Sequence, residues 1–122
     1  MSVGVKSYRD LEVWKKSMGL AERVYALTRN WPREEAYGLT SQVRRASVSV
    51  PSNIAEGSAK QTTGEFLQAL GHARGSLAEV ETQVLLATRF GYLELTDSES
   101  VLSDCDTISR MLTGLDKSLH SK

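Results

Sequence analysis

Four stretches of the 122-residue sequence carry apolar residues at intervals of three and four. That spacing places the apolar side chains on one face of an α-helix, and no stretch shows the alternation that is typical of strands. We predict helices over about residues 8–30, 34–59, 63–90 and 97–118. Connections of about 3 to 6 residues favour antiparallel neighbours. The sequence therefore predicts an all-α fold: one domain over residues 1–122, an up-down-up-down antiparallel four-helix bundle.

The first predicted helix has an unusually broad apolar stripe. Leu11, Trp14, Met18, Tyr25 and Thr28 mark one face, and further apolar residues, Val13, Leu20, Val24 and Leu27, widen it. Trp14 is expected to anchor the core. Trp31-Pro32 is expected to end the helix, because the residue before a proline is pushed out of the helical region. Trp31 is expected either to cap the core or to lie in an interface.

A proline interrupts the second predicted helix. Pro51 has no N–H group and crowds the carbonyl of Ser47, although the helical spacing continues on both sides. Such a proline kinks or breaks a helix. We predict one bent helix, kinked at Pro51, or two helices stacked end to end.

The last two helices carry signals at their ends. Thr62 with Glu65, and Thr96 with Glu99, have the spacing of a capping box. Gly91 is well placed to end the third helix in a left-handed conformation. On the fourth helix, Cys105 continues an apolar row, which favours a place in the core over a reactive role.

The composition of the chain limits the classes of protein to which it can belong. A single cysteine allows no intramolecular disulfide, which fits a reducing compartment. Residues 1–10 lack the apolar core of a signal peptide, and no segment approaches the roughly 18 consecutive apolar residues of a membrane span. We expect a cytoplasmic protein.

Net charge is zero but unevenly distributed. Residues 1–60 hold ten Lys and Arg against six Asp and Glu, and residues 61–122 hold five against nine. Solvated helix faces are the ordinary explanation. The alternatives are a basic face that contacts phosphate and an attraction between the two halves across subunits. The candidate nucleic-acid contacts are Lys15, Lys16, Arg23, Arg44 and Arg45.

The sequence shows no recognisable catalytic motif. His72 and His120 each lack the glutamate three residues earlier that di-iron bundles use, and no phosphate loop or nucleophile elbow is present. We predict a protein that is not an enzyme, with no catalytic residues, no cofactor and no metal site.

A polar stripe runs along the second helix. Arg45, Ser49, Asn53 and Glu56 are spaced by four, four and three, beside the apolar row. On the third helix, Gly71 and Gly75 remove side chains from one strip, which suggests a close approach by another group. Internal packing, a subunit interface and a ligand surface all remain open for these features.

Several segments resemble one family over nearly the whole chain. They are Tyr8-Arg9-Asp10-Leu11-Glu12-Val13-Trp14, Tyr37-Gly38-Leu39-Thr40-Ser41-Gln42-Val43-Arg44-Arg45-Ala46, Ser49-Val50-Pro51-Ser52-Asn53-Ile54-Ala55-Glu56-Gly57, Gly75-Ser76-Leu77-Ala78-Glu79-Val80-Glu81-Thr82-Gln83 and Gly91-Tyr92-Leu93. The chain resembles the four helix bundle protein family, also called the 23S rRNA intervening-sequence protein family.

This resemblance implies a homo-oligomer, a ring of five subunits, and no catalytic residues. The family's motif residues correspond to Arg45, Pro51, Asn53, Glu56, Gly57, Gly75, Ser76 and Glu79, which we interpret as a bend and a polar network joining the second and third helices. A protein related in fold, the accessory variability determinant of diversity-generating retroelements, is a basic pentamer that binds nucleic acid and the reverse transcriptase. This chain departs from it in being neutral.

Two hypotheses of function follow. The first is a non-enzymatic, homo-oligomeric binding module that contacts RNA, DNA or a nucleic-acid enzyme through a basic face. The alternative is a structural or protein–protein interaction bundle with no nucleic-acid role. The candidate polar network or interface in either case comprises Arg45, Ser49, Asn53, Glu56, Gly75, Ser76 and Glu79.

Overall fold

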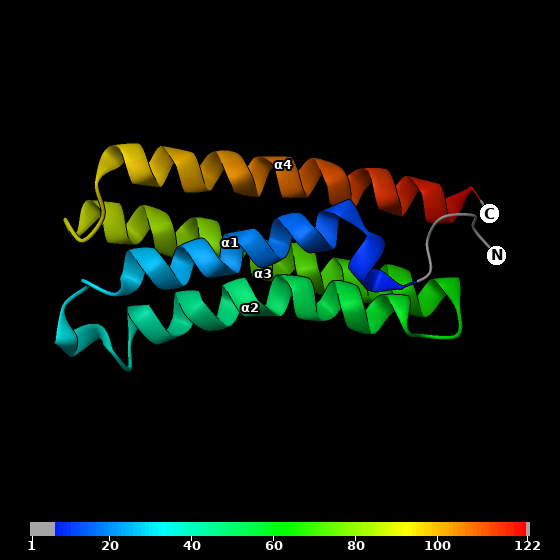
Figure 1. Cartoon of the computed structure of the whole chain (residues 1–122), viewed down its shortest axis with the longest axis horizontal. Helices are drawn as coiled ribbons and strands as arrows, with labels where there is room; N and C mark the ends of the chain where they lie inside the picture. Colours follow the sequence, from blue (N-terminus) through cyan, green and yellow to red (C-terminus); the bar gives the residue numbers. More distant parts are fainter. Residues whose placement is uncertain (1–6, 122) are drawn as a thin grey trace.

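The computed structural model describes residues 7–121, so the ends of the predicted domain, residues 1–6 and 122, lie outside it. The elements are the 3₁₀ helix η1 (Tyr8–Asp10), α1 (Glu12–Thr28), the 3₁₀ helix η2 (Arg33–Glu35), α2 (Leu39–Ser58), α3 (Thr63–Arg89) and α4 (Leu95–His120). Residues 7–121 include no strand. Successive helices run in opposite directions (Figure 1). The predicted all-α, up-down-up-down four-helix bundle is confirmed.

Each helix packs on its neighbours in the chain, and α1 closes the bundle against α4. The tightest pair is α2 with α3. A Cβ atom placed on Gly57 would lie 2.7 Å from the Cβ of Ala69 and 2.9 Å from Cδ1 of Phe66, closer than real Cβ contacts come. Glycine is therefore what lets the C-terminal turn of α2 lie against α3.

One cluster of buried apolar side chains runs through all four helices. Its largest fully buried members include Leu20, Ile54, Leu70 and Ile108. Cys105 is fully buried in the same cluster, which confirms its predicted place in the core. Within residues 7–121 no helix has the length and apolar character that crossing a membrane requires.

The ends of α3 follow the sequence signals. The Thr62 hydroxyl accepts a hydrogen bond from the Glu65 amide at 3.1 Å, so Thr62 is the N-cap as predicted. Only this half of the capping box forms, because the Glu65 carboxylate accepts from the Thr62 hydroxyl at 2.9 Å. Gly91 has a φ of 82°, as predicted. The Tyr92 amide donates to the Ala87 carbonyl at 2.9 Å and the Gly91 amide to the Thr88 carbonyl at 3.1 Å. These two bonds satisfy carbonyls that the end of a helix leaves free.

The predicted start of the fourth helix is wrong. The helix begins at Leu95, with Glu94 as its N-cap and no side-chain hydrogen bond to the cap. Thr96 and Glu99 are therefore the second and fifth residues of α4, and Thr96 does not occupy the N-cap position from which a capping box forms.

The predicted apolar face of α1 is only partly correct. The buried residues are Val13, Ser17, Leu20, Val24 and Thr28, whereas Met18 and Tyr25 are 39% and 43% exposed. Trp14 is half-buried at the edge of the core, not its anchor. The stripe is wider than the surface that α2 and α4 can cover, so its edge stays open.

The helix boundaries near the first connection also differ from the prediction. α1 ends at Thr28, before Trp31-Pro32, and Trp31 is buried in the turn that follows, capping the core. α2 begins only at Leu39, after a separate 3₁₀ helix. α2 then continues without a break across Pro51, so the predicted alternative of two helices stacked end to end is wrong. A kink at Pro51 stays a prediction.

Candidate functional site

A groove runs between α2 and α3 on the outer side of the bundle. Two adjoining hollows, which share Ser49 and Glu79, form it. We define the α2/α3 groove by Gln42, Arg45, Ser49, Asn53 and Glu56 from α2 and by Gly71, His72, Gly75, Ser76, Glu79 and Gln83 from α3. Ala46 and Val48 of α2 and Tyr25 of α1 also line its first hollow. All seven residues of the predicted polar network lie in the groove.

Three polar side chains form the floor of this groove. The buried Ser76 hydroxyl bonds to the Ser49 hydroxyl across the two helices, with 2.8 Å between the oxygens. Asn53 Nδ2 donates to the Ser49 carbonyl at 2.8 Å and to the Ser49 hydroxyl at 2.9 Å. The bond between Ser49 and Ser76 joins α2 to α3 within one chain and sets the register between them.

The charged residues of the groove point outward. Arg45, Glu56 and Glu79 are exposed, and their side chains form no hydrogen bond or ion pair with any part of the chain that the structure describes. The groove therefore offers one cation and two carboxylates to a binding partner.

The two glycines of α3 do not serve packing within the chain. A Cβ atom on Gly71 or Gly75 would meet no atom within 4 Å, in contrast to Gly57. Of the roles considered for these two glycines, internal packing is therefore excluded. Their missing side chains leave open space in the α2/α3 groove.

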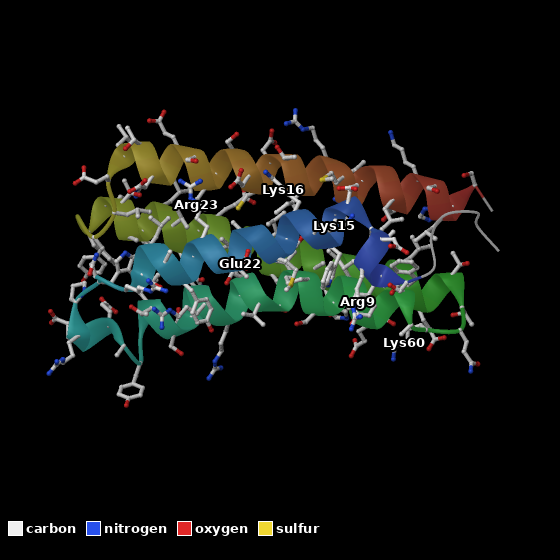
Figure 2. The ribbon with its side chains drawn as sticks, in the orientation of Figure 1. Arg9, Lys15, Lys16, Glu22, Arg23 and Lys60 are labelled. Carbon is white, nitrogen blue, oxygen red and sulfur yellow. The ribbon has the colours of Figure 1, made fainter. Side chains whose placement is uncertain are left out.

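Two of the three candidate nucleic-acid contacts on α1, Lys16 and Arg23, turn toward α4. Lys16 Nζ lies 3.2 Å from Asp104 Oδ1, and Arg23 lies 3.8 Å from Asp104 and 4.0 Å from Asp97. Figure 2 shows Lys16 and Arg23 along the edge of α1 next to α4, while Arg9 and Lys60 lie near the opposite long side of the view. Positive charge in the first half of the chain is thus offset by carboxylates of the second half.

The remaining basic candidates make different contacts. Lys15 pairs with the exposed Glu12 at 3.5 Å. Arg44 donates from Nε to the Thr28 hydroxyl at 2.8 Å and lies over the Tyr25 ring, 4.6 Å from its centroid. Arg45 faces the α2/α3 groove. The five candidates thus differ in their contacts, and only Arg45 has no partner among residues 7–121.

A second, apolar groove between α1 and α2 was missed from the sequence. Tyr8, Trp14, Met18, Tyr25, Val48 and Pro51 contribute to its lining. Val48 is 41% exposed, similar to Met18 and Tyr25. The broad apolar stripe of the first helix was the sequence signal for this groove, because the stripe is wider than the side of a helix that faces the core.

Glu56, His72 and Glu79 line the α2/α3 groove but are not placed to hold a metal ion together. Among residues 7–121 no group of three or more His, Cys, Asp or Glu side chains is placed to hold a metal ion. Burial, with smaller contributions from the charges of Glu81 and Asp104, raises the pKa of Cys105 to about 12. A thiol with this pKa is a poor nucleophile near neutral pH.

These features define the class of protein: an all-α four-helix bundle with a polar groove between its second and third helices. The chain belongs to the 23S rRNA-intervening sequence protein family, whose model matches residues 9–114. It is also similar to a crystal structure of a protein of unknown function from the S23 ribosomal protein family of Bacteroides thetaiotaomicron. That similarity has 26% identity and a TM-score of 0.77, and it covers 86% of this chain and 98% of the other. A comparison with curated proteins found no match.

Proposed function

We propose that the protein is a non-enzymatic interaction module that works as a homo-oligomer through protein–protein contacts. The observation that supports it best is the α2/α3 groove. Its floor is held by the hydrogen bonds between Ser49, Asn53 and Ser76, and its charged side chains have no partners among residues 7–121. A base that is already held by hydrogen bonds suits recognition, because that part of the surface needs no further ordering on contact.

The charge distribution favours a protein partner over nucleic acid. Affinity for phosphate rises with the number of cations that replace counterions. Lys16 and Arg23 already face carboxylates of α4, and the α2/α3 groove carries charges of both signs. A mixed surface of this kind suits another protein.

Measurement of mass in solution tests this function. Light scattering and sedimentation over a range of protein concentrations are expected to give a multiple of 13.4 kDa. The ring of five that the resemblance implies corresponds to about five times that mass. A particle of 13.4 kDa at every concentration contradicts the proposal.

Nucleic-acid binding through Lys15, Lys16, Arg23, Arg44 and Arg45 is the second candidate. Arg45 favours it, because this exposed cation has no carboxylate partner among the described residues. The family description, which mentions 23S rRNA, also favours nucleic-acid binding. Mobility-shift assays with rRNA fragments and duplex DNA, at low and moderate salt, test it. No retardation at low salt, or equal retardation by the Arg44→Glu/Arg45→Glu variant, contradicts this candidate.

The non-enzymatic part of the proposal has its own test. Elemental analysis of the purified protein is expected to find no stoichiometric iron, manganese or zinc. A stoichiometric metal, or a turnover abolished by Glu56→Gln or Glu79→Gln, contradicts a purely binding role. Glu22→Gln is a suitable control, because Glu22 is exposed on α1 outside the α2/α3 groove.

A further inference from the structure

We propose that the apolar groove between α1 and α2 binds an amphipathic helix of another protein. We call this surface the α1/α2 groove, and it meets the α2/α3 groove only at Tyr25 and Val48. This partner goes beyond the proposed homo-oligomer, because it is a different protein and docks on a different surface.

The wall of the groove on α1 is an apolar stripe that the core leaves uncovered. Its members stand four, three and four residues apart, on one face of the helix: Trp14, Met18, Ala21 and Tyr25. The face of α1 that packs on the core consists of other residues: Val13, Ser17, Leu20, Val24 and Thr28. The helix therefore has a second apolar face, which is directed into the α1/α2 groove.

The opposite wall, on α2, has the same helical spacing. Val48, Pro51 and Ala55 stand three and four residues apart and line the groove. Two walls of this spacing form a surface on which a third helix packs, with its ridges in their grooves. From Trp14 to Arg29 the groove extends over about 22 Å of α1, or about four helical turns. A helix fills that length, whereas a compact small molecule fills only part of it.

Two aromatic side chains of the groove are held in place by their neighbours. The Trp14 ring packs edge to face on the Tyr8 ring, with 5.3 Å between the centroids. Arg44 lies over the Tyr25 ring, 4.6 Å from its centroid. Tryptophan and tyrosine supply much of the energy of protein contacts, and rings that are already held lose little rotamer freedom on binding. Trp14 and Tyr25 are therefore the anchors for the apolar side chains of a partner helix.

Two unpaired charges define the chemistry of the partner. Glu22 and Arg29 line the groove seven residues apart, about 10 Å along α1. Both are exposed, and neither side chain forms a hydrogen bond or ion pair with the part of the chain that the structure describes. Figure 2 shows Glu22 on the α2 side of α1, opposite the edge that carries Arg23. A partner helix with one basic and one acidic residue seven positions apart, beside its apolar stripe, pairs with both charges at once.

The outer surface of this chain does not supply such a helix. Outside the groove, the exposed large apolar side chains are Tyr37, Leu85, Leu86, Phe90 and Leu95. They lie in or beside the connections at one end of the bundle (Figure 1). Among residues 7–121, no helix presents an outward apolar stripe four turns long to the groove of a second copy. The occupant is therefore a helix of a different protein.

A synthetic peptide tests the site. The striped peptide is a helix of about 18 residues with a leucine stripe, no aromatic residue, and one Lys and one Glu seven positions apart beside the stripe. Trp31→Phe leaves Trp14 as the only tryptophan, so its emission reports on the groove. The striped peptide is expected to shift this emission in a saturable way, and a scrambled peptide of the same composition is not. Calorimetry with the unmodified full chain makes the same comparison without a substitution.

A charge placed in the apolar stripe is expected to block the peptide. Met18→Lys should weaken binding of the striped peptide at least tenfold, because an ammonium group then lies against apolar side chains. Leu85→Lys is the matched control and should leave binding unchanged, since Leu85 lies outside the groove. Met18 is 39% exposed and Leu85 48%, so neither substitution buries a charge in the core.

An exchange of charge tests the chemistry of the partner. The unmodified protein is expected to bind the Lys/Glu peptide about threefold more tightly than a peptide with Lys at both positions. Arg29→Glu is expected to reverse that order, because the groove then carries two carboxylates. Arg110→Glu on α4 changes the net charge equally and is expected to keep the original order. The same order in all three proteins overturns the pairing with Glu22 and Arg29.

The outcomes distinguish this partner from the proposed homo-oligomer. Equal responses to the striped and scrambled peptides, or undiminished binding by Met18→Lys, overturn the inference and leave the proposed function standing. A Met18→Lys variant whose particle mass falls assigns the groove to contact between copies, which also overturns the inference. Binding to phosphatidylcholine–phosphatidylglycerol vesicles that Met18→Lys abolishes, without a response to the striped peptide, assigns the groove to a lipid surface, with the same consequence. An unmodified protein that stays at 13.4 kDa but binds the striped peptide contradicts only the proposed function.

Discussion

The Tyr92 hydroxyl donates a hydrogen bond to Glu35 Oε2 at 2.9 Å, joining two connections that are far apart in the sequence. Glu35 Oε1 also accepts from the Leu39 amide at 3.0 Å. Since the N-cap residue Gly38 has no side chain to cap α2, Glu35 supplies that acceptor from one turn earlier. One carboxylate thus holds the start of α2 to the turn between α3 and α4, which lie at the same end of the bundle (Figure 1).

Removal of this carboxylate is expected to destabilise the bundle. Glu35→Ala leaves the Leu39 amide without its acceptor, and the loss of a helix cap costs about 1 kcal/mol in the free energy of unfolding. Urea denaturation followed by circular dichroism measures the change. Glu34→Ala is the control, because Glu34 is an exposed neighbour in the same 3₁₀ helix without a capping bond. Equal effects of the two variants would contradict the capping role.

Ionisation of Tyr92 is expected to reveal the same contact. The hydrogen bond to Glu35 raises the pKa of Tyr92 above its ordinary value of 10.0, with smaller contributions from burial and from the charges of Glu35 and Glu34. The folded state therefore favours the neutral phenol. Its contribution to stability is present below pH 10 and is lost as pH rises through the folded pKa.

Ultraviolet titration of tyrosinate absorbance checks this expectation. The difference between the unmodified protein and Tyr92→Phe is expected to show a group that ionises later than an ordinary tyrosine. The relative stability of the unmodified protein over the variant is expected to fall above pH 10. A difference spectrum that titrates at the ordinary tyrosine value argues against the contact with Glu35.

Cys105 is expected to be unreactive in the folded protein. It is fully buried, and its pKa is raised to about 12, so roughly one thiol in ten thousand is ionised at pH 8. Labelling with a thiol reagent should be slow in buffer and rapid in denaturant, with one equivalent incorporated. Rapid labelling under native conditions, at a rate independent of unfolding, would show that the cysteine is accessible.

Addition of one methyl group at Gly57 is expected to disturb the contact of α2 with α3. Gly57→Ala would place its Cβ 2.7 Å from the Cβ of Ala69, and overpacking of this kind costs about 1 to 3 kcal/mol in unfolding free energy. Gly19→Ala, where no atom lies within 4 Å, is the control and should not destabilise. Ala69→Gly should partly rescue Gly57→Ala in a double-mutant cycle. Absence of coupling would mean that another contact limits the approach.

The left-handed turn after α3 is expected to require glycine. Gly91 has a φ of 82°, a conformation that costs other residues about 1 to 2 kcal/mol, so Gly91→Ala should lower the thermal midpoint. Gly114→Ala should raise it or leave it unchanged, because Gly114 lies within α4 and has free space around it. A Gly91→Ala variant as stable as the unmodified protein would contradict the role of this turn.

Signals that depend on neighbours in the sequence predicted the structure well. The cap of α3 at Thr62 and its end at Gly91 involve residues only a few positions apart, and both are confirmed. Thr96 and Glu99 show the limit of such signals. The same local pattern occurs there, but α4 starts at Leu95, and the predicted capping box does not form.

The sequence by itself determined that four amphipathic helices form an antiparallel bundle, because periodicity and short connections act over a few residues. Tertiary structure decided which part of the broad α1 stripe is buried, since that depends on how far α2 and α4 reach around it. It also decided that Lys16 meets Asp104, and that Arg45, Glu56 and Glu79 gather in one groove. Side chains from different helices meet only once packing sets the register, which here depends on contacts such as those of Gly57 and Ser76.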